Sequence, residues 1–129
     1  MNRMLIDTNI YSHALRGTAE VVEVLRGANL IAVSAINIGE LLSGFKGGKN
    51  EKQNRKELAQ FLDSPRVRLF PIDDETAEFY ASILDGLKSL GRPIPTNDIW
   101  ISAVALQHGL PLFSRDQHFE WVPGLILVE

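Results

Sequence analysis

The chain contains no cysteine among its 129 residues. Disulfide scaffolds, cysteine-ligated zinc, iron–sulfur clusters and thiol catalysis are therefore excluded, and a reducing compartment is the simplest interpretation. The chain also lacks any apolar run near the roughly 20 residues that a membrane span requires. Its first apolar run meets an acid at Asp7, where a signal peptide would still need its apolar centre. We therefore expect a soluble, cytoplasmic protein without a membrane segment.

The chain also lacks an excess of positive charge, because it has 13 Lys and Arg residues and 16 Asp and Glu residues, which gives a net charge of −3. This balance argues against a protein that holds nucleic acid by a global positive field. The distribution is uneven, however, because seven bases and three acids between Lys46 and Arg68 give this basic segment a charge of +4. The rest of the chain then carries −7. The basic segment is either a solvated helix face or a phosphate-contacting surface.

Five short apolar runs have the length of buried strands, at residues 4–6, 30–33, 67–70, 111–113 and 125–128. They alternate with six segments of helical spacing, at residues 10–16, 19–26, 35–45, 51–62, 75–90 and 97–108. Thr96 is the predicted N-cap of the last helix, and Gly109 its predicted stop. Because helices supply the crossovers that parallel strands need, we predict an α/β fold. It is a single domain over residues 1–129, with three α/β/α layers and a mainly parallel five-stranded sheet.

Acidic residues fall where this fold would bring them together. Asp7 directly follows the first strand, and two residues separate Asp116 from the run 111–113. Asp98 lies two residues after the Thr96 cap, and Glu40 lies in the second turn of the helix that begins near residue 35. The carboxyl ends of parallel strands share one edge with the N-termini of the returning helices, and ligands bind there. Four acids from distant parts of the sequence can therefore reach one place.

Each acid also has an ordinary structural interpretation. Asp7 could begin a helix, Asp116 could form a turn, and Asp98 could serve the helix dipole, which is worth about 0.3–1 kcal/mol. Glu40 lies almost opposite the apolar stripe of its helix, so by itself it would be assigned to solvent. The convergence of all four acids favours a functional site.

Such a cluster of like charges calls for a cation. Two carboxylates ~5 Å apart at an effective dielectric constant of ~20 repel by roughly 3 kcal/mol. Oxygen donors without cysteine favour magnesium or manganese, and His13, His108 and His118 lack a zinc-binding spacing, so we assign them to the surface or to packing. Acidic magnesium sites commonly activate water to attack a phosphodiester. No glycine-rich phosphate loop is present, which disfavours nucleotide hydrolysis by a P-loop.

Four segments together resemble a PIN domain of the VapC type, the toxin of bacterial toxin–antitoxin pairs. They are residues 4–9 (MLIDTN), 34–41 (SAINIGEL), 95–98 (PTND) and 114–119 (SRDQHF). The resemblance covers the whole chain, and its specificity lies in the order and spacing of the four segments. It implies an endoribonuclease that depends on Mg²⁺ or Mn²⁺, acts on RNA as a dimer and is neutralised by a small antitoxin protein.

The resemblance also implies roles for individual residues. The residues that match the catalytic and metal-binding acids are Asp7, Glu40, Asp98 and Asp116. The polar residues that match supporting positions are Thr8, Asn9, Asn97 and Ser114. The charge of the basic segment, and not the resemblance, predicts contacts to RNA or antitoxin at Lys46, Lys49, Lys52, Arg55 and Lys56.

Three alternatives stand beside this interpretation. A phospho-receiver domain would need paired acids after the first strand and a Lys after the last strands, but Thr8 and Asn9 follow Asp7 and no Lys follows Lys88. A haloacid-dehalogenase-like phosphatase would need a second acid at position 9, which is Asn9 here. A non-catalytic RNA- or protein-binding module of PIN-like fold remains the second interpretation. Cleavage of RNA by metal-loaded, antitoxin-free protein separates it from the enzyme.

Overall fold

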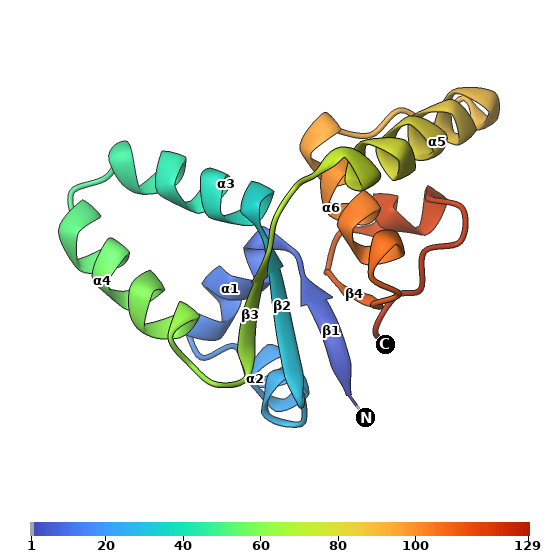
Figure 1. Ribbon diagram of the computed structural model, residues 1–129. Coiled ribbons are helices and arrows are strands. Elements are labelled where there is room, and N and C mark those ends of the chain that lie inside the picture. The colour runs from blue at the N-terminus through green and yellow to red at the C-terminus, as the bar shows by residue number, and fades with distance from the viewer. Residues whose placement is uncertain (1) are drawn as a thin grey trace.

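The computed structural model describes residues 2–129 and contains one parallel sheet (Figure 1). Its strands are β1 (Arg3–Ile6), β2 (Leu30–Ser34), β3 (Val67–Phe70) and β4 (Leu112–Phe113). They lie in the order β3-β2-β1-β4, and every neighbouring pair is parallel. The register places Met4 opposite Ile31 and Leu5 opposite Leu112. Strands β3, β2 and β1 lie side by side in the reverse of their order along the chain, and β4 lies on the other side of β1. Crossover connections between parallel strands allow this order.

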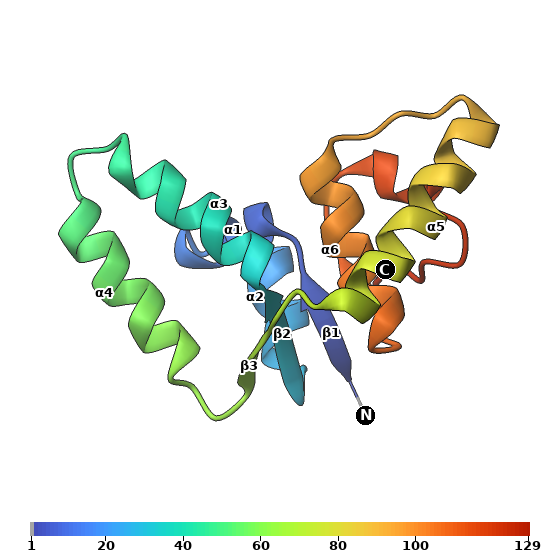
Figure 2. The same ribbon diagram turned by 45° about the horizontal axis from the view of Figure 1, so that its top comes forward.

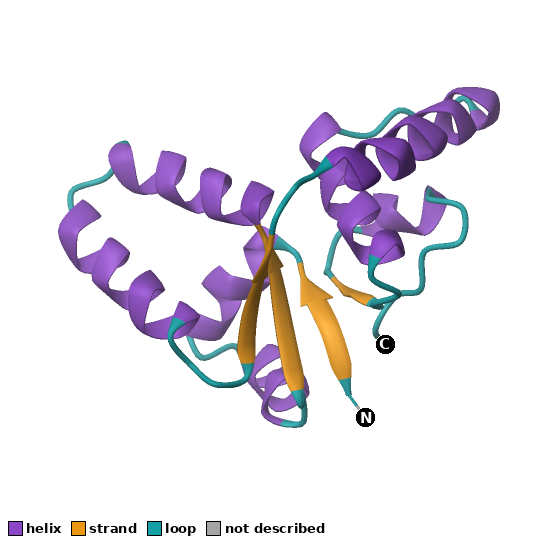
Figure 3. Cartoon of the chain, viewed as in Figure 1, coloured by secondary structure: helices purple, strands orange, loops and turns teal. Residues whose placement is uncertain are grey.

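The predicted fifth strand at residues 125–128 is wrong. Leu127 forms only an isolated parallel bridge with Leu112, through backbone hydrogen bonds from Leu112 N to Ile126 O (2.8 Å) and from Val128 N to Leu112 O (2.9 Å). Because β4 has only two residues, it offers too short a ladder for a fifth strand, and Ile126 is 69% exposed. Figure 3 shows the C-terminal segment as loop.

Six helices surround the sheet. Their bounds are α1 (Thr8–Leu15), α2 (Ala19–Arg26), α3 (Ala35–Lys46), α4 (Glu51–Leu62), α5 (Asp74–Leu90) and α6 (Thr96–Gln107). A short 3-10 helix, Gln117–Trp121, follows β4. Helices α3 and α4 form a hairpin that extends away from the sheet, whereas α5 and α6 lie on its other side (Figure 1 and Figure 2). Within residues 2–129 there is no helix with the length and apolar character to cross a membrane.

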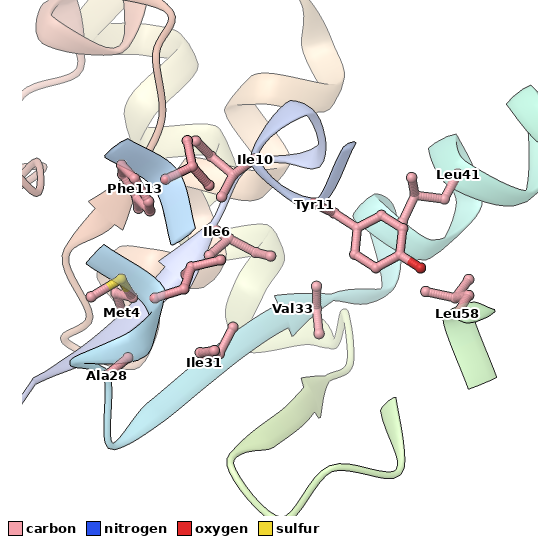
Figure 4. Close-up of a cluster of buried hydrophobic side chains, with 12 residues drawn as sticks. Met4, Ile6, Ile10, Tyr11, Ala28, Ile31, Val33, Leu41, Leu58 and Phe113 are labelled. Carbon is pink, nitrogen blue, oxygen red and sulfur yellow. The ribbon is translucent and has the colours of Figure 1, made fainter. Parts of the chain in front are cut away.

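Alternation along the strands explains the layers. Met4 and Ile6 of β1 belong to a core shared with α1 and α2 (Figure 4), whereas Leu5 between them belongs to a core shared with α6. Successive side chains of a strand point to opposite faces, so apolar residues at every position require helices on both faces. The three-layer α/β prediction is therefore confirmed.

All of the helix boundaries agree with the prediction within two residues. Gly109 follows α6 with a left-handed φ of 64°, a conformation that glycine adopts without steric cost, so the predicted stop is confirmed. The predicted N-cap at Thr96 is wrong by one residue. Pro95 holds that position with a φ of −56°, and its carbonyl accepts hydrogen bonds from the backbone N–H groups of Asp98 (3.0 Å) and Ile99 (3.2 Å).

Candidate active site

The four predicted acids surround one pocket at the carboxyl edge of the sheet. Its volume is about 480 Å³. The lining residues are Asp7, Thr8, Asn9, Glu40, Pro95, Thr96, Asn97, Asp98 and Asp116. Asp7 follows β1, and Glu40 and Asp98 come from the first half of α3 and the first turn of α6, so the parallel topology gathers them.

Asp7 is the deepest of the acids, with 5% of its surface exposed. It is the N-cap of α1, and its Oδ1 accepts a hydrogen bond from the backbone N–H of Thr8 (2.8 Å). The hydroxyl of Ser114 donates to its Oδ2 (3.0 Å). The pKa of Asp7 is raised to about 6, mainly by burial and to a lesser extent by the charges of Asp98 and Asp116, against the lowering effect of these hydrogen bonds. Asp7 is therefore a carboxylate whose charge the protein alone does not fully stabilise.

Glu40 points into the pocket because two polar side chains hold it there. The hydroxyl of Thr8 donates to its Oε1 (2.5 Å), and the amide of Asn97 donates to its Oε2 (3.3 Å). Helical spacing by itself would assign this face of the helix to solvent, but at the edge of the sheet the same face meets the start of α6, as the convergence of the acids predicted. The N-termini of α1 and α6 thus orient a carboxylate of α3.

Asp98 is held by a residue that sequence reasoning missed. The Oδ2 of Asp98 lies 2.7 Å from Nε2 of His118, and Nδ1 of the same ring lies 3.8 Å from Oδ1 of Asp116. The assignment of His118 to the surface or to packing is therefore wrong. Its position two residues after Asp116 in the segment 114–119 was the available signal. The other two histidines fit the assignment, since His108 packs edge-on against Phe70 and His13 contacts Thr18 and Arg16 away from the acids.

The pKa of Asp98 is also raised. Burial is the largest cause, the charges of Glu40 and Asp116 act in the same direction, and His118 opposes them. Asp116 lies at the rim, where its side chain is 49% exposed. The site thus has two sheltered acids, Asp7 and Asp98, and a more open side.

The donors suit a hard cation, although no ligand cage is formed in advance. Among residues 2–129, no three acidic or histidine side chains are spaced as the ligands of one metal ion. Magnesium commonly keeps several waters and uses one or two carboxylates, so it requires no closed protein cage. The all-oxygen donor set and the raised pKa values of Asp7 and Asp98 fit such a cation, because it would stabilise the charged carboxylates.

The basic segment lies outside this pocket. Lys46 and Arg55 each approach Glu51, at 3.7 Å and 3.8 Å, whereas within residues 2–129 no ion pair involves Lys49, Lys52 or Lys56. These three lysines line a shallow hollow at the tip of the α3–α4 hairpin together with Asn50, Gln53 and Arg55. The hollow shares no lining residue with the acidic pocket.

Comparisons with known proteins agree with this fold and arrangement. Residues 4–125 match the PIN domain family. The chain is 34% identical over 121 residues to toxin FitB of Neisseria gonorrhoeae, covering 88% of this chain and 87% of that protein. It is 28% identical over 128 residues to ribonuclease VapC2 of Rickettsia felis, covering 95% and 94%. The chain belongs to the PIN-domain family.

Solved structures show the same fold. The structure of VapBC2 from Rickettsia felis bound to a DNA fragment from their promoter superposes with a TM-score of 0.85, at 27% identity, covering 98% of this chain and 97% of that chain. A toxin–antitoxin complex from Klebsiella pneumoniae gives a TM-score of 0.73 at 26% identity, covering 95% of each chain.

Proposed function

We propose that this protein is an endoribonuclease toxin that hydrolyses RNA phosphodiesters with the help of Mg²⁺ or Mn²⁺. The observation that carries the proposal is the open pocket in which two sheltered carboxylates of raised pKa, Asp7 and Asp98, face Glu40 and Asp116. Similarity to a protein named as a ribonuclease and to one named as a toxin supports the same function.

The residues of the pocket have distinct tasks in this proposal. When bound, the cation lowers the pKa of a water molecule and offsets negative charge that develops on the phosphate. Asp7 and Asp98 would hold the cation, and Ser114 and His118 keep these two carboxylates oriented. Glu40, oriented by Thr8 and Asn97, and Asp116 at the rim complete the set of acids.

An antitoxin is the second partner that we propose. The structural relatives include a toxin–antitoxin complex, which supports a small protein that binds this chain and blocks the pocket. The basic segment offers the cationic surface for RNA or antitoxin. Dimer formation stays a prediction.

The test is cleavage of RNA by purified, antitoxin-free protein with and without added metal. We expect cleavage with Mg²⁺ or Mn²⁺, its loss with a chelator, and its restoration when metal is returned. Sequencing the ends of the products would identify the sites that are cut. Protein that binds metal and RNA yet leaves the RNA intact would overturn the enzyme in favour of a non-catalytic binding module.

A further inference from the structure

A fully buried side chain behind the pocket connects the start of α3 to the acids. Asn37 is 0% exposed and does not line the pocket. It closes a capping box, in which its Oδ1 accepts hydrogen bonds from the backbone N–H of Ser34 (2.8 Å) and from the hydroxyl of Ser34 (2.7 Å). These two donors to one oxygen fix which side of the amide faces the cap. The Nδ2 group of Asn37 must therefore face the other way, toward Thr8.

The direction of each following hydrogen bond is then determined. Nδ2 of Asn37 has only hydrogens to offer, so Thr8 Oγ1 accepts from it at 2.9 Å. The single hydroxyl hydrogen of Thr8 then goes to Glu40. Without Asn37, the hydroxyl of Thr8 would lose the donor that fixes its direction toward Glu40.

Two acids of the pocket are linked to this series of hydrogen bonds. Thr8 donates its hydroxyl to Glu40 and its backbone N–H to Asp7, so one residue contacts both carboxylates. Asn37 sets the hydroxyl of that residue from behind. A buried amide that does not line the pocket is thus connected through the Thr8 hydroxyl to the carboxylate of Glu40.

A second capping box in the same molecule shows that this link is not required for capping. At the start of α5, Asp73 and Thr76 form the reciprocal pair, and Thr76 is also 0% exposed. The hydroxyl of Thr76 forms hydrogen bonds with Asp73 and with Gln107 of α6, and neither residue lines the acidic pocket. Threonine therefore suffices for a buried cap in this fold. The Nδ2 group of Asn37 is an addition whose only hydrogen-bond partner within residues 2–129 is Thr8.

We propose that Asn37 is a positioning residue of the acidic pocket, which through Thr8 holds the Glu40 carboxylate in the orientation that receives a divalent cation. This inference rests on the proposed metal-dependent function. Partners that orient metal ligands from behind typically contribute 10–100-fold to metal affinity.

The test measures Mn²⁺ binding to the full-length protein, by paramagnetic resonance of the free ion. Asn37→Thr copies the residue of the second capping box, so it keeps a cap and loses the amide that reaches Thr8. Thr8→Val removes the hydroxyl at nearly constant volume. We expect each variant to raise the Mn²⁺ dissociation constant at least tenfold. The double variant should bind no more weakly than Thr8→Val alone, because Asn37 acts through Thr8.

The matched control is Thr76→Val, which damages the other buried cap. It should lower the melting temperature of metal-free protein and leave the Mn²⁺ dissociation constant unchanged. If Asn37→Thr does not fold, Asn37→Asp takes its place, because its carboxylate keeps the acceptor for both Ser34 donors. That variant adds negative charge, which alone would tighten Mn²⁺ binding. Weaker binding would therefore show that the orientation of Glu40 is lost.

Two failures are distinguishable. If the unsubstituted protein binds no Mn²⁺ at millimolar concentration, the proposed function fails and this inference with it. If the unsubstituted protein binds Mn²⁺ and Asn37→Thr binds it equally well, only the inference is overturned. It is also overturned if Thr76→Val weakens binding as much as Asn37→Thr, or if the effects of Asn37→Thr and Thr8→Val simply add.

Discussion

At the scale of single residues, Asp98 distinguishes chemistry from capping. It occupies the first turn of α6, where a negative charge meets the helix dipole at a gain of about 0.3–1 kcal/mol. The same carboxylate is sheltered beside Glu40 and Asp116, and its pKa is raised because burial and these charges disfavour ionisation. The two roles predict opposite effects when the charge is removed.

We predict that metal-free Asp98→Asn melts at or above the temperature of the unsubstituted protein, gains less stability from added metal, and fails to cut RNA. The amide keeps the shape and can still accept a hydrogen bond from His118, so charge is the variable that changes. Thermal melting with and without metal, together with an RNA cleavage assay, checks this. Undiminished cleavage at low metal concentration would mean that Asp98 only stabilises the helix dipole and does not take part in catalysis.

Asp7 gives the metal-free protein a pH dependence of known sign. Its pKa is raised from 3.8 to about 6 in the fold, because burial disfavours the charged form. The corresponding stability is fully present below about pH 4 and is lost as the pH rises through 6, for a total of about 3 kcal/mol at most. We therefore expect the free energy of unfolding, relative to Asp7→Asn, to fall between pH 4 and pH 7.

Denaturant titrations of both proteins at several pH values measure this difference, which also removes the contribution of other acids. Asp73 acts in the opposite direction, because hydrogen bonds from Thr76 and Gln107 lower its pKa, and its contribution is common to both proteins. A difference that does not change with pH would mean that Asp7 ionises in the fold as it does in water.

At the scale of elements, the α3–α4 hairpin carries three lysines that form no ion pair within residues 2–129. Lys49, Lys52 and Lys56 are exposed, and surface charges of this kind add little to stability. We predict that changing all three to Glu leaves the melting temperature nearly unchanged but weakens RNA binding. If all three meet phosphates of a single strand, the slope of log K against log salt should decrease by about 2.

The control for this variant reverses three cations elsewhere, Arg3, Arg26 and Lys88, so that the net charge changes equally. RNA and antitoxin affinities are measured at several salt concentrations for both variants. If neither affinity responds to the change in the hairpin, the basic segment is only a solvated helix face.

At the scale of the whole molecule, a cation that binds only the folded state must stabilise it. At about 100 times the dissociation constant, Mg²⁺ or Mn²⁺ should add about 2.7 kcal/mol to the free energy of unfolding. The melting temperature should therefore rise with metal concentration, and much less so for Asp7→Asn, which lacks one of the sheltered acids. A melting temperature that millimolar metal leaves unchanged would contradict the proposed site.

The elements could largely be predicted because their signals are local. Helical spacing and strand length depend on residues a few positions apart, and six helices and four strands lie where those signals place them. The prediction failed at residues 125–128, because a strand needs a partner of sufficient length and β4 has only two residues. Apolar composition carries no information about the length of the neighbouring strand.

The convergence of the acids also followed from the sequence, because a parallel topology gathers strand ends and helix starts at one edge. Their hydrogen-bond partners did not. Ser114 and Asp7 are 107 residues apart, Asn97 and Glu40 are 57 apart, and His118 reaches back 20 residues to Asp98. The sequence by itself determined that these acids share one edge of the sheet, since chain order and strand direction suffice for that. Only the tertiary structure decided how each carboxylate is oriented, because a hydrogen bond depends on packing to within a few tenths of an ångström.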